Sequence, residues 1–189
     1  VLGLTRLINR AQNMESLKKY AGQIETQVQK MMDVLNNEKK PMDLSKYAGQ
    51  MAGGSEMRLE GIRVLLAEDG EMNAEIITRL LTNAGAQCDR AADGMQALRL
   101  FEAAQAGTYD VILMDMQMPV MDGCAASRAI RRSMKEDAAA IPIVSMTANT
   151  FDEVRERIFD AGMDGYLGKP VEPDKLSCAL LAAVRGKRG

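Results

Sequence analysis

From Ile62 onward, short apolar runs alternate with amphipathic stretches, and this alternation repeats five times. The apolar runs have the length of strands, and the stretches between them have the 3.6-residue spacing of helices. We predict strands at 63–67, 86–90, 111–114, 141–146 and 165–167, and helices at 73–83, 95–106, 124–135, 152–161 and 174–184. Five strand–helix units with right-handed crossovers predict an α/β fold, a doubly wound parallel sheet with helices on both faces.

Polar residues follow four of the predicted strands, where the chain leaves the sheet. In a doubly wound sheet the functional site lies beyond the carboxyl ends of the central strands, so these residues should meet there. They are Glu68 and Asp69 after the first strand, Asp115 after the third, Thr147 after the fourth and Lys169 after the fifth.

This group of side chains predicts phosphoryl transfer assisted by a metal ion. Three clustered carboxylates repel one another unless a cation neutralises them, and oxygen ligands suit Mg²⁺. Phosphoryl transfer needs a nucleophile and positive charge around the phosphoryl oxygens, which the metal and Lys169 would supply. Asp115 is the predicted nucleophile.

The composition excludes several other functions. The chain has no histidine, so phosphohistidine has to come from a partner, and histidine metal sites and Ser-His triads are excluded. Acidic and basic residues are interspersed with a net charge of −2, which argues against direct nucleic-acid binding. No apolar run is long enough to cross a membrane, so we expect a cytoplasmic chain without membrane contact, any anchor lying elsewhere in the parent protein.

Ahead of the repeating pattern, residues 1–36 carry apolar side chains at helical spacing and predict a helical hairpin. So small a hairpin leaves an apolar stripe uncovered, so we expect it to form a homodimer in preference to docking on the other domain. Residues 37–61 are polar and contain Gly53-Gly54, and we expect a linker there. The second domain is then 62–189.

Residues 62 to about 185 resemble the receiver domain of bacterial response regulators, of the chemotaxis-receiver type. The matching stretches are 64–69 (VLLAED), 110–119 (DVILMDMQMP), 121–123 (MDG), 145–148 (SMTA) and 165–170 (GYLGKP). The resemblance implies a flavodoxin-like sheet of strand order 2-1-3-4-5. It also implies a two-component phosphorelay in which Asp115 takes a phosphoryl group from a histidine kinase or a histidine phosphotransfer protein.

The same resemblance implies how the metal is held. Mg²⁺, or Mn²⁺, would bind Glu68 or Asp69, Asp115 and the backbone carbonyl of Gln117. The domain would catalyse its own phosphorylation and dephosphorylation. One departure is Gly70, where many relatives carry asparagine.

It also implies a switch and a backbone feature. Thr147 would bond a phosphoryl oxygen, Lys169 would pair with the phosphoryl group, and Tyr166 would swing inward when Asp115 is phosphorylated. The peptide bond before Pro170 would be cis.

The first 35 residues resemble the dimerisation and phosphotransfer hairpin of sensor histidine kinases, starting just past the phosphorylated histidine. This resemblance implies that the parent is a hybrid sensor histidine kinase. No stretch between Asn36 and Gly61 could form an ATP-binding domain, so the chain should not phosphorylate itself from ATP.

Two alternatives remain. A phosphatase of the haloacid dehalogenase type also uses a strand-end aspartate, but it needs a second aspartate two residues on, where this chain has Gln117. A stand-alone response regulator or docking module, working through its dimerising hairpin, is the other alternative. The complete set of strand-end residues favours a domain that is phosphorylated.

Overall fold

A computed structural model describes residues 42–43, 58–149 and 151–187 of the 189-residue chain. The predicted helical hairpin at 1–36 and most of the predicted linker lie outside these residues. No helix among the described residues is long and apolar enough to cross a membrane.

All five predicted strands and all five predicted helices are present. The strands are β2 (Arg63–Ala67), β3 (Gln87–Ala91), β4 (Val111–Asp115), β5 (Ile143–Thr147) and β6 (Gly165–Gly168). The helices are α2 (Glu71–Asn83), α3 (Gly94–Ala103), α4 (Gly123–Arg132), α5 (Phe151–Asp160) and α6 (Pro173–Lys187). The strands are all parallel and lie in the order β3-β2-β4-β5-β6, which confirms the predicted order 2-1-3-4-5.

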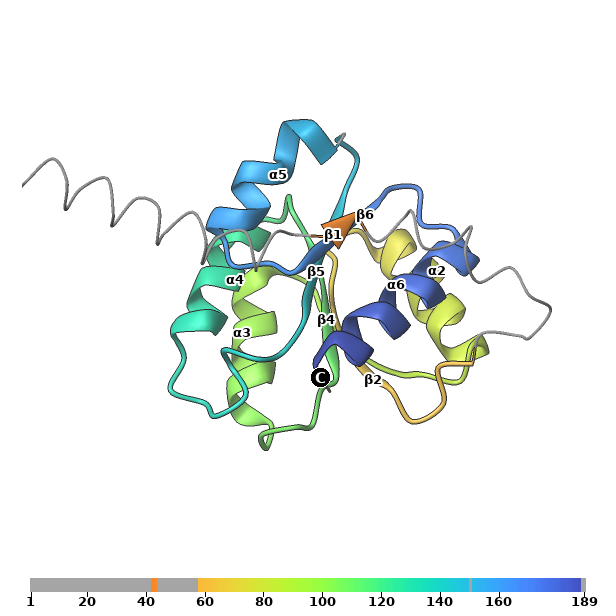
Figure 1. The fold of residues 1–189 in the computed structure, drawn as a ribbon, viewed down its shortest axis with the longest axis horizontal. Coiled ribbons are helices and arrows are strands. Elements are labelled where there is room, and N and C mark those ends of the chain that lie inside the picture. Colours follow the sequence, from red (N-terminus) through yellow and green to blue (C-terminus); the bar gives the residue numbers. More distant parts are fainter. Residues whose placement is uncertain (1–41, 44–57, 150, 188–189) are drawn as a thin grey trace, which may run out of the picture. The chain divides into compact units, whose positions relative to one another are not determined.

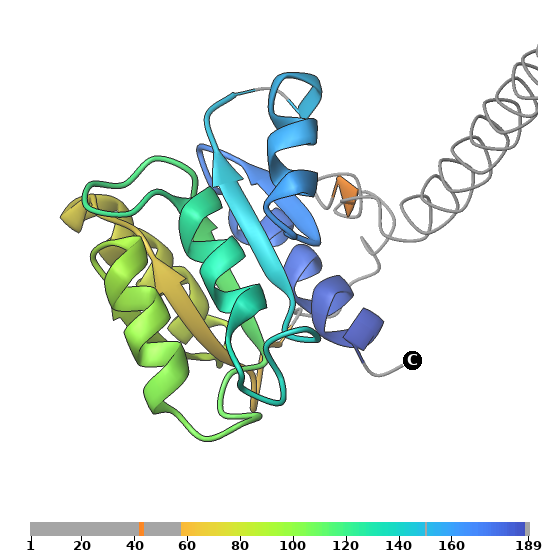
Figure 2. The same cartoon turned by 90° about the vertical axis from the view of Figure 1, so that its left-hand side faces the viewer.

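A sixth strand, β1 (Met42–Asp43), pairs in parallel with β6 at the edge of this sheet (Figures 1 and 2). It lies within the segment that we expected to be a linker, and two residues are too few to show a strand period. Leu59, from the same segment, is fully buried. Residues before Ile62 therefore contribute to the sheet and to its core.

The sheet separates two apolar cores, because alternate residues of each strand face opposite sides. In β2, Leu65 and Ala67 belong to the core under α3, α4 and α5, whereas Val64 and Leu66 belong to the core under α2 and α6. Figure 1 shows α3 and α4 on one side of the strands and α2 and α6 on the other. Because helices cover both faces of the sheet, consecutive residues of β2 are apolar.

Helices α3 and α4 each end three residues earlier than predicted. Ala104 and Ser133, which follow them, have extended backbone with ψ of 154° and 144°. Beyond α4, the ammonium of Lys135 donates to the carbonyl of Phe101 at 2.6 Å and lies 4.1 Å from the centre of its ring. Lys135, which the helical pattern had assigned to α4, thus makes a tertiary contact with α3.

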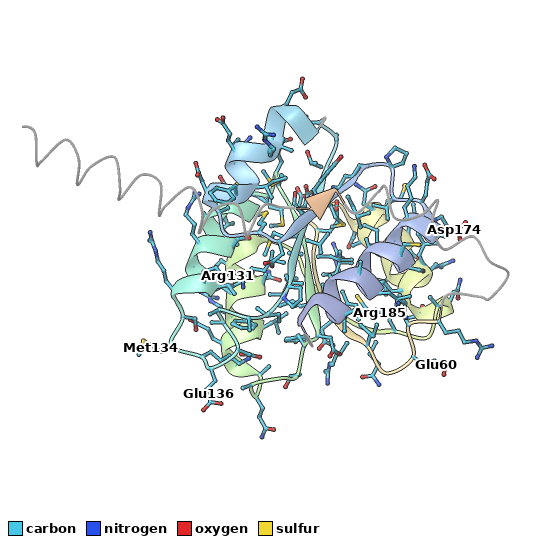
Figure 3. All side chains as sticks on the ribbon, in the orientation of Figure 1. Glu60, Arg131, Met134, Glu136, Asp174 and Arg185 are labelled. Atoms are coloured by element: carbon cyan, nitrogen blue, oxygen red, sulfur yellow. The ribbon has the colours of Figure 1, made fainter. Side chains whose placement is uncertain are left out.

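The guanidinium of Arg131 joins three segments at the amino-terminal end of β5. It donates to the carbonyls of Ala138 and Ile141 at 2.7 and 2.8 Å, and to that of Gly162 at 2.8 Å. It also forms an ion pair of 2.7 Å with Asp164. Figure 3 shows Arg131 beside the loop that carries Met134 and Glu136. One side chain thus fastens the loop before β5 to the turn before β6.

Candidate functional site

The strand order brings the predicted carboxylates together. β2 and β4 are neighbours, so Glu68 and Asp69, just after β2, meet Asp115 at the end of β4. One carboxylate oxygen from each residue lies within 4.8 Å of the others. Thr147 and Lys169 line the same pocket of about 160 Å³. All five predicted strand-end residues therefore converge.

Lys169 connects two of the three carboxylates. Its ammonium donates to Glu68 Oε2 at 2.7 Å and to Asp115 Oδ2 at 2.8 Å. Its backbone N–H donates to the carbonyl of Thr147 at 2.7 Å, which holds the start of the loop against β5. The Lys169–Pro170 peptide bond is cis, which confirms that prediction.

Burial sets the electrostatics of this group. The side chains of Glu68 and Asp115 are 1% and 9% exposed, whereas Asp69 is exposed. Burial raises the pKa of Asp115, and the hydrogen bond from Lys169 only partly offsets this effect. Burial lowers the pKa of Lys169, but its hydrogen bonds to Asp115 and Glu68 outweigh burial and the net pKa is raised. The ammonium therefore stays charged, and it bonds the two buried carboxylates.

Asn73 is a member of the site that the sequence analysis missed. Its side-chain amide donates to Glu68 Oε1 at 3.1 Å, so both oxygens of Glu68 are bonded. A Cβ at Gly70 would lie 3.0 Å from Glu68 Oε1 and 3.1 Å from the Asn73 amide, so glycine leaves room for this contact. A polar residue in the first turn of the helix after β2 was the available signal.

The loop after β4 packs tightly around the backbone of Asp115. The N–H of Gln117 donates to Asp115 Oδ1 at 3.2 Å. At Gly123 an added Cβ would clash with the carbonyl oxygen of Asp115, so no larger residue fits. Val120 is 82% exposed and has a φ of 66°, a left-handed conformation that is rare for a β-branched residue. The loop thus combines close packing with local backbone strain.

Thr147 and Tyr166 lie on neighbouring strands. Thr147 is buried and its hydroxyl accepts a hydrogen bond from the N–H of Asn149 at 3.1 Å. Tyr166 is 8% exposed and packs in the core under α3, α4 and α5. In the register of β5 and β6, Thr147 pairs with Gly168, two residues beyond Tyr166.

Comparison with known proteins assigns the family. A family model described as the response regulator receiver domain matches residues 64–181, which include every strand end of the site. The chain belongs to the response regulator receiver domain family. Its role in two-component signalling and its flavodoxin-like fold, both predicted from the sequence, are thereby confirmed.

Curated relatives of this receiver are large histidine kinases. Hybrid signal transduction histidine kinase I of Dictyostelium discoideum is 34% identical over 148 residues, which cover 76% of this chain and 8% of that protein. Peroxide stress-activated histidine kinase mak1 of Schizosaccharomyces pombe is 39% identical over 121 residues, covering 64% of this chain and 7% of the kinase. The chain therefore spans less than a tenth of the length of either relative.

A solved structure of another receiver domain is similar to this chain in sequence and in fold. The receiver domain of sensor histidine kinase PA1611 from Pseudomonas aeruginosa PAO1 is 38% identical, with a TM-score of 0.60, and the match covers 66% of this chain and 98% of that one. That structure has a magnesium ion coordinated in its active site cleft.

Proposed function

We propose that this receiver accepts a phosphoryl group from phosphohistidine on a carboxylate oxygen of Asp115, with Mg²⁺ as cofactor. The observation that carries the proposal is the placement of Asp115 in a pocket with two further carboxylates and one ammonium, 2.8 Å from Lys169 Nζ. In the transfer an oxygen of Asp115 bonds to phosphorus while the phosphorus–nitrogen bond to histidine breaks. The electron pair of that bond stays on the histidine nitrogen.

The donor set fits a hard divalent cation. Carboxylate oxygens of Glu68, Asp69 and Asp115 are close enough to share an ion, and such ions prefer oxygen ligands. We assign Asp115, Glu68 or Asp69, and the backbone carbonyl of Gln117 to the metal. When bound, the metal would supply positive charge to the phosphoryl oxygens.

Lys169 and Thr147 complete the proposed machinery. Lys169 is the cation that would bond a phosphoryl oxygen, since it already bonds the oxygen of Asp115. The hydroxyl of Thr147 would donate to another phosphoryl oxygen. We further propose that Tyr166 changes position together with Thr147, because they lie on the paired strands β5 and β6, Thr147 opposite Gly168 and Tyr166 opposite Ser145.

The phosphohistidine that donates the phosphoryl group must lie outside this 189-residue sequence, because the sequence contains no histidine. A second pocket of about 400 Å³ adjoins the site, lined by Ile76 and Ile77 of α2 and by Lys169, Pro170 and Val171. Met72 and Ile76 are 76% and 51% exposed on the same helix. We propose that the apolar surface of α2 docks the protein that carries phosphohistidine.

The parent protein is proposed to be a hybrid sensor histidine kinase. This proposal rests on the similarity to hybrid kinases of which the chain covers less than a tenth. The receiver would then exchange phosphoryl groups with a kinase or a histidine phosphotransfer protein.

Intact-mass spectrometry after incubation with acetyl phosphate and Mg²⁺ tests the proposed site. We expect one phosphoryl adduct on the unmodified chain, dependent on Mg²⁺, and none on Asp115→Asn. An adduct that survives in Asp115→Asn would contradict the assignment of Asp115. No adduct on either chain would contradict the proposed phosphorylation.

A further inference from the structure

The β6 edge is where a segment from outside the five-stranded sheet adds to it. An edge strand presents unpaired backbone N–H and C=O groups along one side, which bind another extended segment. Here β1 occupies that side in parallel, with Met42 opposite Gly165 and Asp43 opposite Tyr166 (Figures 1 and 2). The bound segment thus pairs with the residue proposed to switch.

β6 also leads directly to the phosphorylation site. Lys169 follows the strand by one residue and bonds Asp115 through its ammonium and Thr147 through its backbone. At about 3.3 Å per residue, the partner of Asp43 lies roughly 10 Å along the chain from Lys169. A four-residue strand therefore has β1 on one side and the site at its end.

Phosphorylation would change what holds Lys169. In the unphosphorylated chain its ammonium is bonded by two carboxylates at 2.7 and 2.8 Å. A phosphoryl group on Asp115 adds bulk and nearly two negative charges where that bond is made. β1 pairs with the conformation that β6 has before phosphorylation. A phosphoryl group that favours another conformation of β6 therefore weakens the pairing with β1.

We propose that the segment containing Met42–Asp43 is an intramolecular strand ligand of the β6 edge, and that phosphorylation of Asp115 releases it. The second half of this inference rests on the proposed function. Release would open the β6 edge to a partner only in the phosphorylated state. Because coupling between two sites is reciprocal, bound β1 would also disfavour the phosphorylated conformation.

Hydrogen exchange of the full chain, read by mass spectrometry, tests the strand. Met42→Pro with Asp43→Pro removes two backbone donors from β1, and Ala52→Pro with Gly53→Pro is the matched control outside it. We expect the peptide covering 165–168 to exchange about tenfold faster in the first variant and unchanged in the control. Equal exchange of this peptide in both variants would overturn the pairing of β1 with the β6 edge.

Phosphorylation tests the release. With acetyl phosphate and Mg²⁺ present, the peptide covering 41–45 should exchange several-fold faster in the unmodified chain and not in Asp115→Asn. A phosphoryl adduct seen by mass, without faster exchange of the 41–45 peptide, would overturn the release of β1 by phosphorylation. The pairing of β1 with β6 would still stand. If no adduct forms, the proposed function fails and the coupling with it, while the proline variants still decide the strand.

Dilution separates an intramolecular strand from one supplied by a second copy. We expect protection of 165–168 to be independent of protein concentration over about a hundredfold range, since an intramolecular contact has a fixed effective concentration. Protection that falls on dilution would overturn the intramolecular assignment.

Discussion

The ammonium group of Lys169 donates to Glu68 at 2.7 Å and to Asp115 at 2.8 Å, and both carboxylates are buried. Replacing the lysine by methionine keeps most of the length of the side chain and removes its charge. The phosphoryl oxygens would then lack their protein cation. We expect Lys169→Met to slow phosphorylation by acetyl phosphate about 10²-fold, measured as the initial rate of adduct formation.

Lys175→Met is the matched control for this change. Lys175 forms an ion pair with Glu172 near the start of α6, where both side chains are partly exposed. Exposed pairs of this kind contribute little to stability. A rate for Lys169→Met within twofold of the control would show that the lysine is dispensable.

The pKa of Asp115 gives a second prediction. Burial raises it, so the carboxyl becomes protonated at a higher pH than an ordinary aspartate, whose pKa is about 3.9. The stability that the Asp115 carboxyl contributes to folding is therefore fully present below about pH 3.9. It is lost as the pH rises through the pKa of Asp115 in the folded chain. Carbon NMR of the metal-free protein should show the raised pKa, with a further rise in Lys169→Met.

Added Mg²⁺ should act in the opposite direction on the same resonance. A cation favours the ionised carboxylate, so the pKa of Asp115 should fall as the Mg²⁺ concentration increases. If Mg²⁺ leaves this pKa unchanged, Asp115 is not in contact with the metal.

Most residues of the candidate site could be predicted because parallel strands end at one edge of the sheet. Glu68, Asp115 and Lys169 each follow a strand, and order along the chain was enough to bring them together. Asn73 was missed because its contact depends on the direction of one side chain and on the space left by Gly70. The roles of the individual residues stay predictions.

At the scale of elements, Arg131 connects α4 to the segments before β5 and β6. Four hydrogen bonds from one planar guanidinium cannot be reproduced by a lysine ammonium. We expect Arg131→Lys to lower the free energy of unfolding by about 2 kcal/mol, measured by urea denaturation. Arg132→Lys, at the exposed neighbouring position, should change it by less than about 0.5 kcal/mol.

The outer surface of α2 carries another prediction. Ile76 is 51% exposed and lines the pocket beside Lys169. We expect Ile76→Asp to slow transfer from a phosphorylated histidine phosphotransfer protein about tenfold, because an apolar contact in the docked complex is lost. Transfer from acetyl phosphate should stay within about twofold, since that small donor needs no docking surface.

Met134→Asp is the control for this surface. Met134 is 99% exposed beyond the carboxyl end of α4, whereas the site lies at the amino-terminal end of that helix. Equal loss of transfer in both variants would mean that added negative charge, and not the surface of α2, is responsible.

The elements themselves were largely predictable, because each strand and helix repeats an apolar pattern long enough to recognise. β1 was not predictable, since its two residues have no period and pair only because β6 offers an edge. The ends of α3 and α4 were predicted too late in the sequence, because the backbone becomes extended at Ala104 and Ser133. Beyond α4, Lys135 bonds the carbonyl of Phe101 in α3. Tertiary contacts decided what local pattern could not.

For the whole molecule, the oligomeric state is the open prediction. We propose that residues 1–36, which lie outside the described residues, form a dimer through their apolar stripe. Light scattering should give twice the chain mass of 20.6 kDa for the full chain and a monomer after deletion of residues 1–55. The same oligomeric state before and after deletion would remove the dimerising role.

The sheet that separates the two cores also bears on how the chain can change over evolutionary time. Phe101 lies in one core and Leu180 in the other, with the strands between them. Substitutions at distant sites without shared partners have additive effects on stability, usually to within about 0.5 kcal/mol. A destabilising change under α3 can thus be compensated by a stabilising one under α6, so the two faces can diverge separately while the strand ends keep the same residues.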